Sequence, residues 1–204
     1  MTDQESKFEQ LIDGIVSKGY AICDDFLSKE EVESLKVRFS DRFEAGEFKK
    51  ANIGKLSESH HSSFIRGDEI LWLEPKSKDI AEKMLLDKNQ SFVNYLNKTC
   101  YLGINETEIH FAKYNAGTFY RRHKDAFQSQ KGRVLSVIYY LNMDWVAADG
   151  GKLVIYSQEN GIEKAIEIAP IAGRVVCFQS EKLAHEVKET FVERLSVTGW
   201  LLAN

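Results

Sequence analysis

The spacing of apolar residues predicts helices in the first part of the chain. Phe8, Leu11 and Ile15 recur at helical intervals, so they share one face of a short helix. Ser28, followed three residues later by a glutamate, is a capping-box pattern that opens a second helix. A third helix is expected over 77–97. The apolar side of this third helix consists of Ile80, Met84, Leu85, Phe92, Tyr95 and Leu96.

Beyond Glu108 the pattern changes from helical to short alternating or continuous β-rich runs. Eight strands are expected, at 108–114, 118–125, 133–142, 151–157, 162–168, 174–179, 184–188 and 194–202. Short strands separated by turn signals favour a sandwich or barrel, and helices followed by strands favour an α+β fold with the helices packed on one face. We expect one domain over 1–204, with 1–107 mainly helical and 108–204 as the β core.

Composition and charge exclude several classes of protein. Apolar residues make up 43% and charged residues 28% of the chain, values typical of globular proteins. The net charge of −4 gives no positive field for nucleic acid, and no apolar run is long enough to span a membrane, so neither partner is expected. Cys23, Cys100 and Cys177 share no repeated spacing, and the N-terminus lacks the pattern of a secretory signal. We therefore expect free thiols and a cytoplasmic protein.

A candidate metal site lies in the β-rich part. His123 and Asp125 fall at the end of a predicted strand, where alternation points both side chains to one side. His185 lies in a later strand-like run. Two histidines and one carboxylate are the ligand set of non-haem Fe(II) oxygenases. A lone His-x-Asp pattern is common by chance, and a histidine on a strand is usually structural, so this pattern alone leaves a structural role open.

The last predicted strand adds a second indication. Alternation places Arg194, Ser196, Thr198 and Trp200 on one face, which is too polar for a packed core but suits a ligand cavity. A guanidinium in such a cavity binds a carboxylate through two hydrogen bonds, which suits a dicarboxylic cosubstrate such as 2-oxoglutarate. The alternative is a structural arginine paired with a glutamate.

The order His-x-Asp, distal His and an Arg nine residues later is the motif order of the Fe(II)/2-oxoglutarate dioxygenases. Five runs resemble the prolyl 4-hydroxylase branch, and within it the hypoxia-inducible-factor prolyl hydroxylases and their bacterial relatives. These runs are IRGDEILWLE (65–74), YNAGTFYRRHKD (114–125), IYYLNMDW (138–145), DGGKLVIY (149–156) and HEV with RLSVTGW (185–187 and 194–200). The resemblance covers roughly residue 19 to the C-terminus. It implies a double-stranded β-helix, or jelly-roll, core.

The resemblance also implies roles for individual residues. The implied iron ligands are His123, Asp125 and His185. The residues implied to bind or enclose 2-oxoglutarate are Arg194, Tyr140, Tyr114, Thr198 and Trp200. The run that follows Tyr114 is one residue shorter than in the animal enzymes, which leaves the role of Tyr120 open.

Three residues are implied to lie on the substrate side. Arg66 and Asp68, with the preceding loop 49–63, resemble a mobile loop that folds over a peptide substrate, and Arg133 resembles a substrate-side residue. The alternative for such charges is simple solvation. Of the remaining histidines, His60 and His61 are expected to be solvent-exposed, and His110 is expected to be structural.

The implied activity is 4-hydroxylation of a prolyl residue in a protein. The implied cofactor is Fe(II), the implied cosubstrates are 2-oxoglutarate and O2, and ascorbate is a candidate reductant. A translation factor is the expected partner if the source is bacterial. Three alternatives stay open: an oxygenase of a free amino acid or other small molecule, an oxygen-responsive sensor, and a silent jelly-roll binding module. The Arg66–Asp68 segment argues against the first, and the complete ligand set argues against the last.

Overall fold

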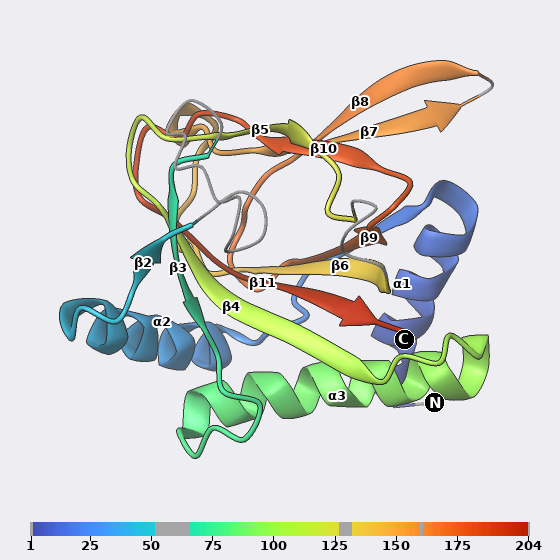
Figure 1. The fold of residues 1–204 in the computed structure, drawn as a ribbon, viewed down its shortest axis with the longest axis horizontal. Coiled ribbons are helices and arrows are strands. Elements are labelled where there is room, and N and C mark those ends of the chain that lie inside the picture. Colours follow the sequence, from blue (N-terminus) through green and yellow to red (C-terminus); the bar gives the residue numbers. More distant parts are fainter. Residues whose placement is uncertain (1, 52–65, 127–131, 160, 204) are drawn as a thin grey trace.

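The computed structural model describes residues 2–51, 66–126, 132–159 and 161–203. Two antiparallel sheets face each other, and three helices cover the outer face of the larger sheet (Figure 1). The helices are α1 (Asp3–Lys18), α2 (Lys29–Glu44) and α3 (Ile80–Cys100), with a short 3-10 helix at Ala147–Asp149. None of these helices has the length and hydropathy needed to cross a membrane.

The larger sheet has seven strands in the order β1-β9-β6-β11-β4-β3-β2, and the smaller has four in the order β5-β10-β7-β8. The strands of the larger sheet are β1 (Tyr20–Cys23), β2 (Lys49–Lys50), β3 (Asp68–Trp72), β4 (Glu106–Tyr114), β6 (Arg133–Tyr140), β9 (Val175–Gln179) and β11 (Arg194–Leu202). Those of the smaller sheet are β5 (Tyr120–His123), β7 (Leu153–Glu159), β8 (Ile162–Ile168) and β10 (Ala184–Val187). This is the jelly-roll arrangement with helices on one face, as predicted.

Local sequence explains where the helices begin. Thr2 and Ser28 each accept a hydrogen bond from the backbone of a glutamate three residues later, so both α1 and α2 open with a capping box. The third helix begins at residue 80 because the Asp79 side chain accepts hydrogen bonds from two backbone amides of the first turn. Ser77 instead donates to the Glu82 side chain, so the predicted start at residue 77 is three residues early. Ile80, expected on the apolar side, is 85% exposed in this first turn.

The larger sheet is packed differently on its two faces. The helix-facing side forms a core with the helices, in which Leu35, Leu85, Phe111 and Val197 are fully buried. Hydrophobic packing of this kind supplies most of the favourable free energy of folding. The opposite face lies against the smaller sheet and encloses a second apolar cluster together with polar side chains.

All eight predicted strands are present, although the strand expected at 118–125 ends at His123. Three strands, β1, β2 and β3, were not predicted. The three cysteines are free thiols, as expected, and Cys177 is buried.

Candidate active site

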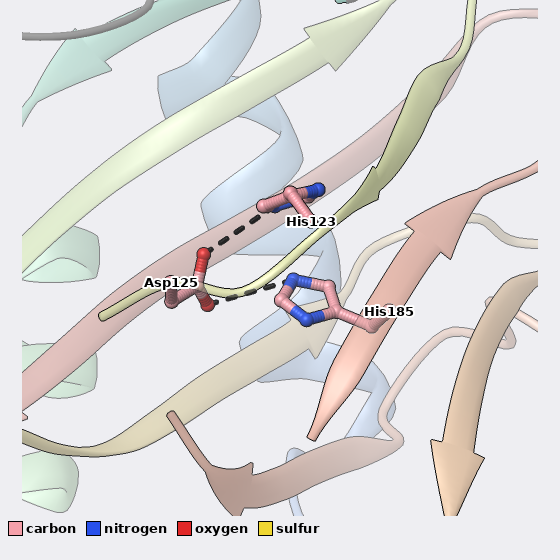
Figure 2. A group of neighbouring side chains, drawn as sticks. All are labelled: His123, Asp125 and His185. Carbon is pink, nitrogen blue, oxygen red and sulfur yellow. Dashed lines mark ion pairs between the residues drawn. The ribbon is translucent and has the colours of Figure 1, made fainter. Parts of the chain in front are cut away.

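Strand pairing brings the three predicted metal ligands together. His123 at the end of β5 lies directly opposite His185 on β10, and Asp125 follows β5 by two residues. One ligand-capable atom from each of the three side chains lies within 4.8 Å of the others. Figure 2 shows both imidazoles turned toward the Asp125 carboxylate, although they come from two different strands. The three side chains therefore form a cluster that could hold a metal ion.

The geometry presents the same ring atom of each histidine to the centre. Asp125 Oδ1 lies 3.5 Å from His123 Nε2, and Oδ2 lies 3.5 Å from His185 Nε2. The opposite ring nitrogens approach main-chain oxygens: His123 Nδ1 is 2.7 Å from Arg121 O and His185 Nδ1 is 3.4 Å from Leu183 O. A proton on Nδ1 that is donated to these carbonyls leaves the Nε2 lone pair free for a metal ion.

The protonation states also suit a cation. Burial lowers the pKa of His185 to about 4, so this imidazole is neutral at neutral pH. Burial on its own would raise the pKa of Asp125, but His185, His123 and the hydroxyl of Ser136 outweigh it and hold this pKa far below its ordinary range. An ionised carboxylate and a neutral imidazole are the protonation states that bind metal.

Tyr120, whose role the sequence left open, packs on a metal-ligand candidate. Its ring stacks on that of His123 with centroids 3.6 Å apart and an angle of 17° between planes. The guanidinium carbon of Arg66 lies 4.4 Å from the centroid of the same Tyr120 ring. Burial raises the pKa of Tyr120 to about 12, so its hydroxyl stays protonated. The stack restricts the orientation of the His123 ring.

Arg194 is 3% exposed and lies next to two tyrosine rings. The centre of its guanidinium is 5.0 Å from the Tyr114 ring centroid and 5.1 Å from that of Tyr140. Its Nε donates to Gly151 O over 2.8 Å, but Nη2 and the Tyr140 hydroxyl are buried without a hydrogen-bond partner in the described part of the chain. No ion pair joins Arg194 to a described carboxylate, contrary to the alternative of an arginine paired with a glutamate.

These unsatisfied groups fit a bound carboxylate. A buried guanidinium without a counter-ion is costly, and a carboxylate ligand would remove that cost through charge-assisted hydrogen bonds. Burial raises the pKa of Tyr140, with Arg194 opposing the shift, so the hydroxyl stays protonated and can donate to the same ligand. The donor set therefore suits the distal carboxylate of 2-oxoglutarate.

The glycine pair 150–151 positions Arg194. Both glycines have positive φ, and a Cβ on Gly151 would lie 3.0 Å from Arg194 Cδ and 3.0 Å from Thr190 Oγ1. Gly151 supplies the main-chain carbonyl oxygen that accepts a hydrogen bond from Arg194. This role was missed at the sequence level because it depends on contact between residues that are 43 positions apart.

The other end of the polar face of β11 is aromatic. Thr198 and Trp200 follow Arg194 along this face, as alternation predicted, and both are half-buried. The Trp200 ring lies 6.0 Å from that of Trp72 and 5.3 Å from that of His110. The Arg133 guanidinium lies 3.6 Å from the Trp200 ring centroid. His110 is buried here, which agrees with the structural position expected for it, and burial lowers its pKa to about 4.

Arg66 and Asp68 are not simply solvated. Arg66 donates to both carboxylate oxygens of Asp68, over 2.7 and 2.5 Å, and Asp68 is buried beside Tyr114 in the register of β3 and β4. The alternative of solvated loop charges is wrong for this pair, and the substrate role stays a prediction. Of the predicted loop 49–63 only residues 49–51 are described, and His60 and His61 lie outside the described residues.

Comparison with known proteins agrees with this geometry. Residues 109–202 match the family model of the 2OG-Fe(II) oxygenase superfamily. The chain resembles a prolyl-4-hydroxylase structure from Pseudomonas putida with 32% identity and a TM-score of 0.84, over 97% of this chain and 99% of that one. The chain belongs to the prolyl 4-hydroxylase branch of the 2OG-Fe(II) oxygenase superfamily. This family uses Fe(II) and 2-oxoglutarate, as the sequence resemblance implied.

Two animal relatives extend the comparison. The human Egl nine homolog 1 is 30% identical over 94% of this chain, which spans 46% of the length of that protein. A prolyl hydroxylase from Trichoplax adhaerens, solved in complex with a peptide of a hypoxia-inducible factor, has 27% identity and a TM-score of 0.87, over 98% of this chain and 90% of that one. The family and the fold are thus shared with enzymes of animals and bacteria.

Proposed function

We propose that this protein is an Fe(II)- and 2-oxoglutarate-dependent dioxygenase that 4-hydroxylates a prolyl residue of a protein substrate and releases succinate and CO2. The observation that carries this proposal is the combination of a three-ligand cluster, in which Asp125 and His185 are buried, and a buried guanidinium that has no counter-ion in the described part of the chain. The 32% identity to the Pseudomonas prolyl-4-hydroxylase over nearly the whole of both chains supports prolyl hydroxylation.

Each group has a defined task in this proposal. His123, Asp125 and His185 would hold Fe(II), which leaves coordination positions open on one side. When bound, the iron and 2-oxoglutarate together activate O2 for insertion of one oxygen atom into a C–H bond. Arg194 would bind the distal carboxylate of 2-oxoglutarate, and Tyr140 would donate to it. The other oxygen atom of O2 goes into succinate, so the atoms balance.

The remaining wall residues would orient the cosubstrate. Tyr114 lies opposite Arg194 in the pairing of β4 with β11 and is buried against it. Thr198 and Trp200 continue this wall toward the aromatic end of β11. Because Arg194 is almost completely buried, its attraction for a carboxylate would be stronger there than in water.

The substrate would approach from the aromatic side. Trp72 is 48% exposed next to Trp200, and Arg133 lies between this pair and the metal ligands because it also donates to the main-chain oxygen of Asp125. Flat aromatic surfaces suit the apolar ring of a prolyl residue. Arg66 and Asp68 would contribute to the same side. The proposed partner is a protein with an exposed prolyl residue, and in a bacterial host we propose a translation factor. The proposed compartment is the cytoplasm, which the three free thiols support.

Mass spectrometry of host proteins would test this function. The proteins are incubated with the enzyme, Fe(II), 2-oxoglutarate, ascorbate and O2, and a His123→Ala variant serves as the control. We expect one oxygen atom on a particular prolyl residue, absent in the control. Turnover of 2-oxoglutarate without any modified protein would contradict the protein substrate and favour a small molecule or an uncoupled sensor. Complete absence of turnover would contradict the enzymatic function and favour a silent binding module.

A further inference from the structure

Asp125 is not held in place by its own strand. β5 ends at His123, and Asp125 lies in the bend that follows. A ligand outside regular structure must be oriented by other contacts if the metal site is to be preformed. In the described part of the chain these contacts come from β6, which neighbours β11 and β9 in the larger sheet.

Two residues of β6 contact Asp125. Ser136 Oγ donates to the carboxylate oxygen Oδ2 over 2.6 Å, and Arg133 Nη1 donates to the main-chain oxygen over 3.2 Å. Strict strand alternation would place Arg133 and Ser136 on opposite faces. The register between β6 and β11 shifts between Leu201 and Leu202, and this shift sets Arg133 opposite Leu202. Arg133 therefore faces the site, as Ser136 does. β-bulges commonly redirect side chains in this way.

A second serine orients the first. Ser180 Oγ lies 2.9 Å from Ser136 Oγ, and both serines are fully buried. A hydroxyl has one proton to donate, and that of Ser136 is used on Asp125, so Ser180 must donate to Ser136. The chain Ser180 to Ser136 to Asp125 is therefore directional, and its geometry is fixed by three buried groups.

We propose that Ser136 is a positioning residue that fixes the Asp125 carboxylate so that one oxygen, Oδ1, is presented to the metal ion, and that Ser180 fixes Ser136. The inference rests on the proposed function for the presence of a metal centre. Without the Ser136 hydroxyl, the carboxylate would be free to rotate out of the orientation that faces the two histidine Nε2 atoms. The expected consequences are weaker metal binding and a changed ligand arrangement around the ion.

The experiment measures the affinity of the metal-free protein for Mn(II) and the visible absorption spectrum of its Co(II) complex, both without substrate. Ser136→Ala should lower the Mn(II) affinity about tenfold, at the lower end of the effect of residues that orient metal ligands, and should change the Co(II) spectrum. Ser136→Thr keeps the hydroxyl and should restore both. Tyr139→Phe removes a fully buried hydroxyl of the same strand that donates to Asn89 on the helix-facing side, and it should leave the Mn(II) affinity unchanged.

Several results would overturn the inference. An unchanged affinity and spectrum in Ser136→Ala would do so, as would a Ser136→Thr variant that is as weak as Ser136→Ala. If Ser136→Ala fails to fold, Ser180→Ala carries the test, because it removes only the donor to Ser136 and should give a smaller loss of affinity; no loss there would contradict the proposal. Wild-type protein that binds no Mn(II) would contradict the proposed metal centre, whereas wild-type binding with unaffected variants would contradict this inference alone.

Discussion

The two faces of the seven-stranded sheet differ in how their polar groups are satisfied. The helix-facing side is a continuous apolar core in which strand residues such as Phe111 and Val197 pack against the helices. The site-facing side also buries large side chains, but several of their polar atoms have no partner. Five buried side-chain atoms without a hydrogen bond are found among the described residues: one belongs to Arg42 of α2, and the others belong to His110, Tyr140, Arg194 and Trp200.

This difference separates stability from binding. The four residues outside α2 lie on strands β4, β6 and β11, and their side chains point to the side of the metal-ligand cluster. These residues are His110, Tyr140, Arg194 and Trp200. Buried polar groups without partners cost free energy, so their concentration on one face indicates where a polar ligand belongs. We expect substitutions on the helix-facing side to lower the free energy of unfolding, and substitutions on the site-facing side to lower ligand affinity and activity.

The largest effect is expected at the metal ligands. His123→Ala removes one of three ligands and should reduce 2-oxoglutarate turnover to the background of metal-free protein, while the variant still folds. Turnover is measured as succinate release, and bound iron by elemental analysis. His110→Phe is the matched control, because it replaces a buried histidine outside the cluster and should retain the iron. A His123→Ala protein that is active and iron-loaded would contradict the assignment.

On the helix-facing side, Phe39→Ala should lower the free energy of unfolding by about 3–5 kcal/mol, because Phe39 is buried against Phe48 and Phe111 and a cavity would remain. Urea denaturation measures the loss. The variant that remains folded should bind Mn(II) with wild-type affinity. Weaker Mn(II) binding by folded Phe39→Ala protein would show that the two faces are not independent.

Arg194→Lys replaces a forked donor by a point charge. The affinity for 2-oxoglutarate should fall about tenfold, which corresponds to one charged hydrogen bond of roughly 1.5 kcal/mol. Calorimetry of the metal-loaded protein measures this affinity, and the Mn(II) affinity should be unchanged. An unaltered 2-oxoglutarate affinity would place the cosubstrate elsewhere.

The smallest effect concerns pH. Burial lowers the pKa of His110 to about 4 from an ordinary value of 6.5, so between these values the unfolded chain binds more protons than the folded one. The stability of the metal-free protein should therefore fall as the pH is lowered from about 6.5 to 4. His110→Phe should make this fall less steep, as measured by urea denaturation across the range. An identical slope in the variant would contradict the buried neutral state of His110.

Local patterns predicted much of the fold. Apolar periodicity identified all three helices, and alternation identified the eight strands after residue 105 and the polar face of β11. The strands β1 to β3 were missed because they are short and lie among helical segments, where pairing with distant partners decides their conformation. The beginning of α3 was misplaced because Ser77 and Asp79 are both capable caps, and only the contact of Ser77 with Glu82 decides between them.

The candidate site was predictable only in part. His123 and Asp125 are close in sequence, so alternation could place them on one side, although Asp125 lies beyond the strand. The contributions of Ser136 and Gly151 could not be found in this way, because they depend on the register between distant strands and on a β-bulge. The metal, cosubstrate and substrate roles of individual residues stay predictions.

The most direct test of a joint metal and 2-oxoglutarate site between the two sheets is a crystal structure of the protein with Fe(II) and 2-oxoglutarate under anaerobic conditions. Anomalous scattering at the iron absorption edge locates the metal. We expect a single strong peak within bonding distance of Nε2 of His123, Nε2 of His185 and a carboxylate oxygen of Asp125, with the distal carboxylate of 2-oxoglutarate on Arg194 and Tyr140. Iron bound away from these three residues, or 2-oxoglutarate without contact to Arg194, would contradict it.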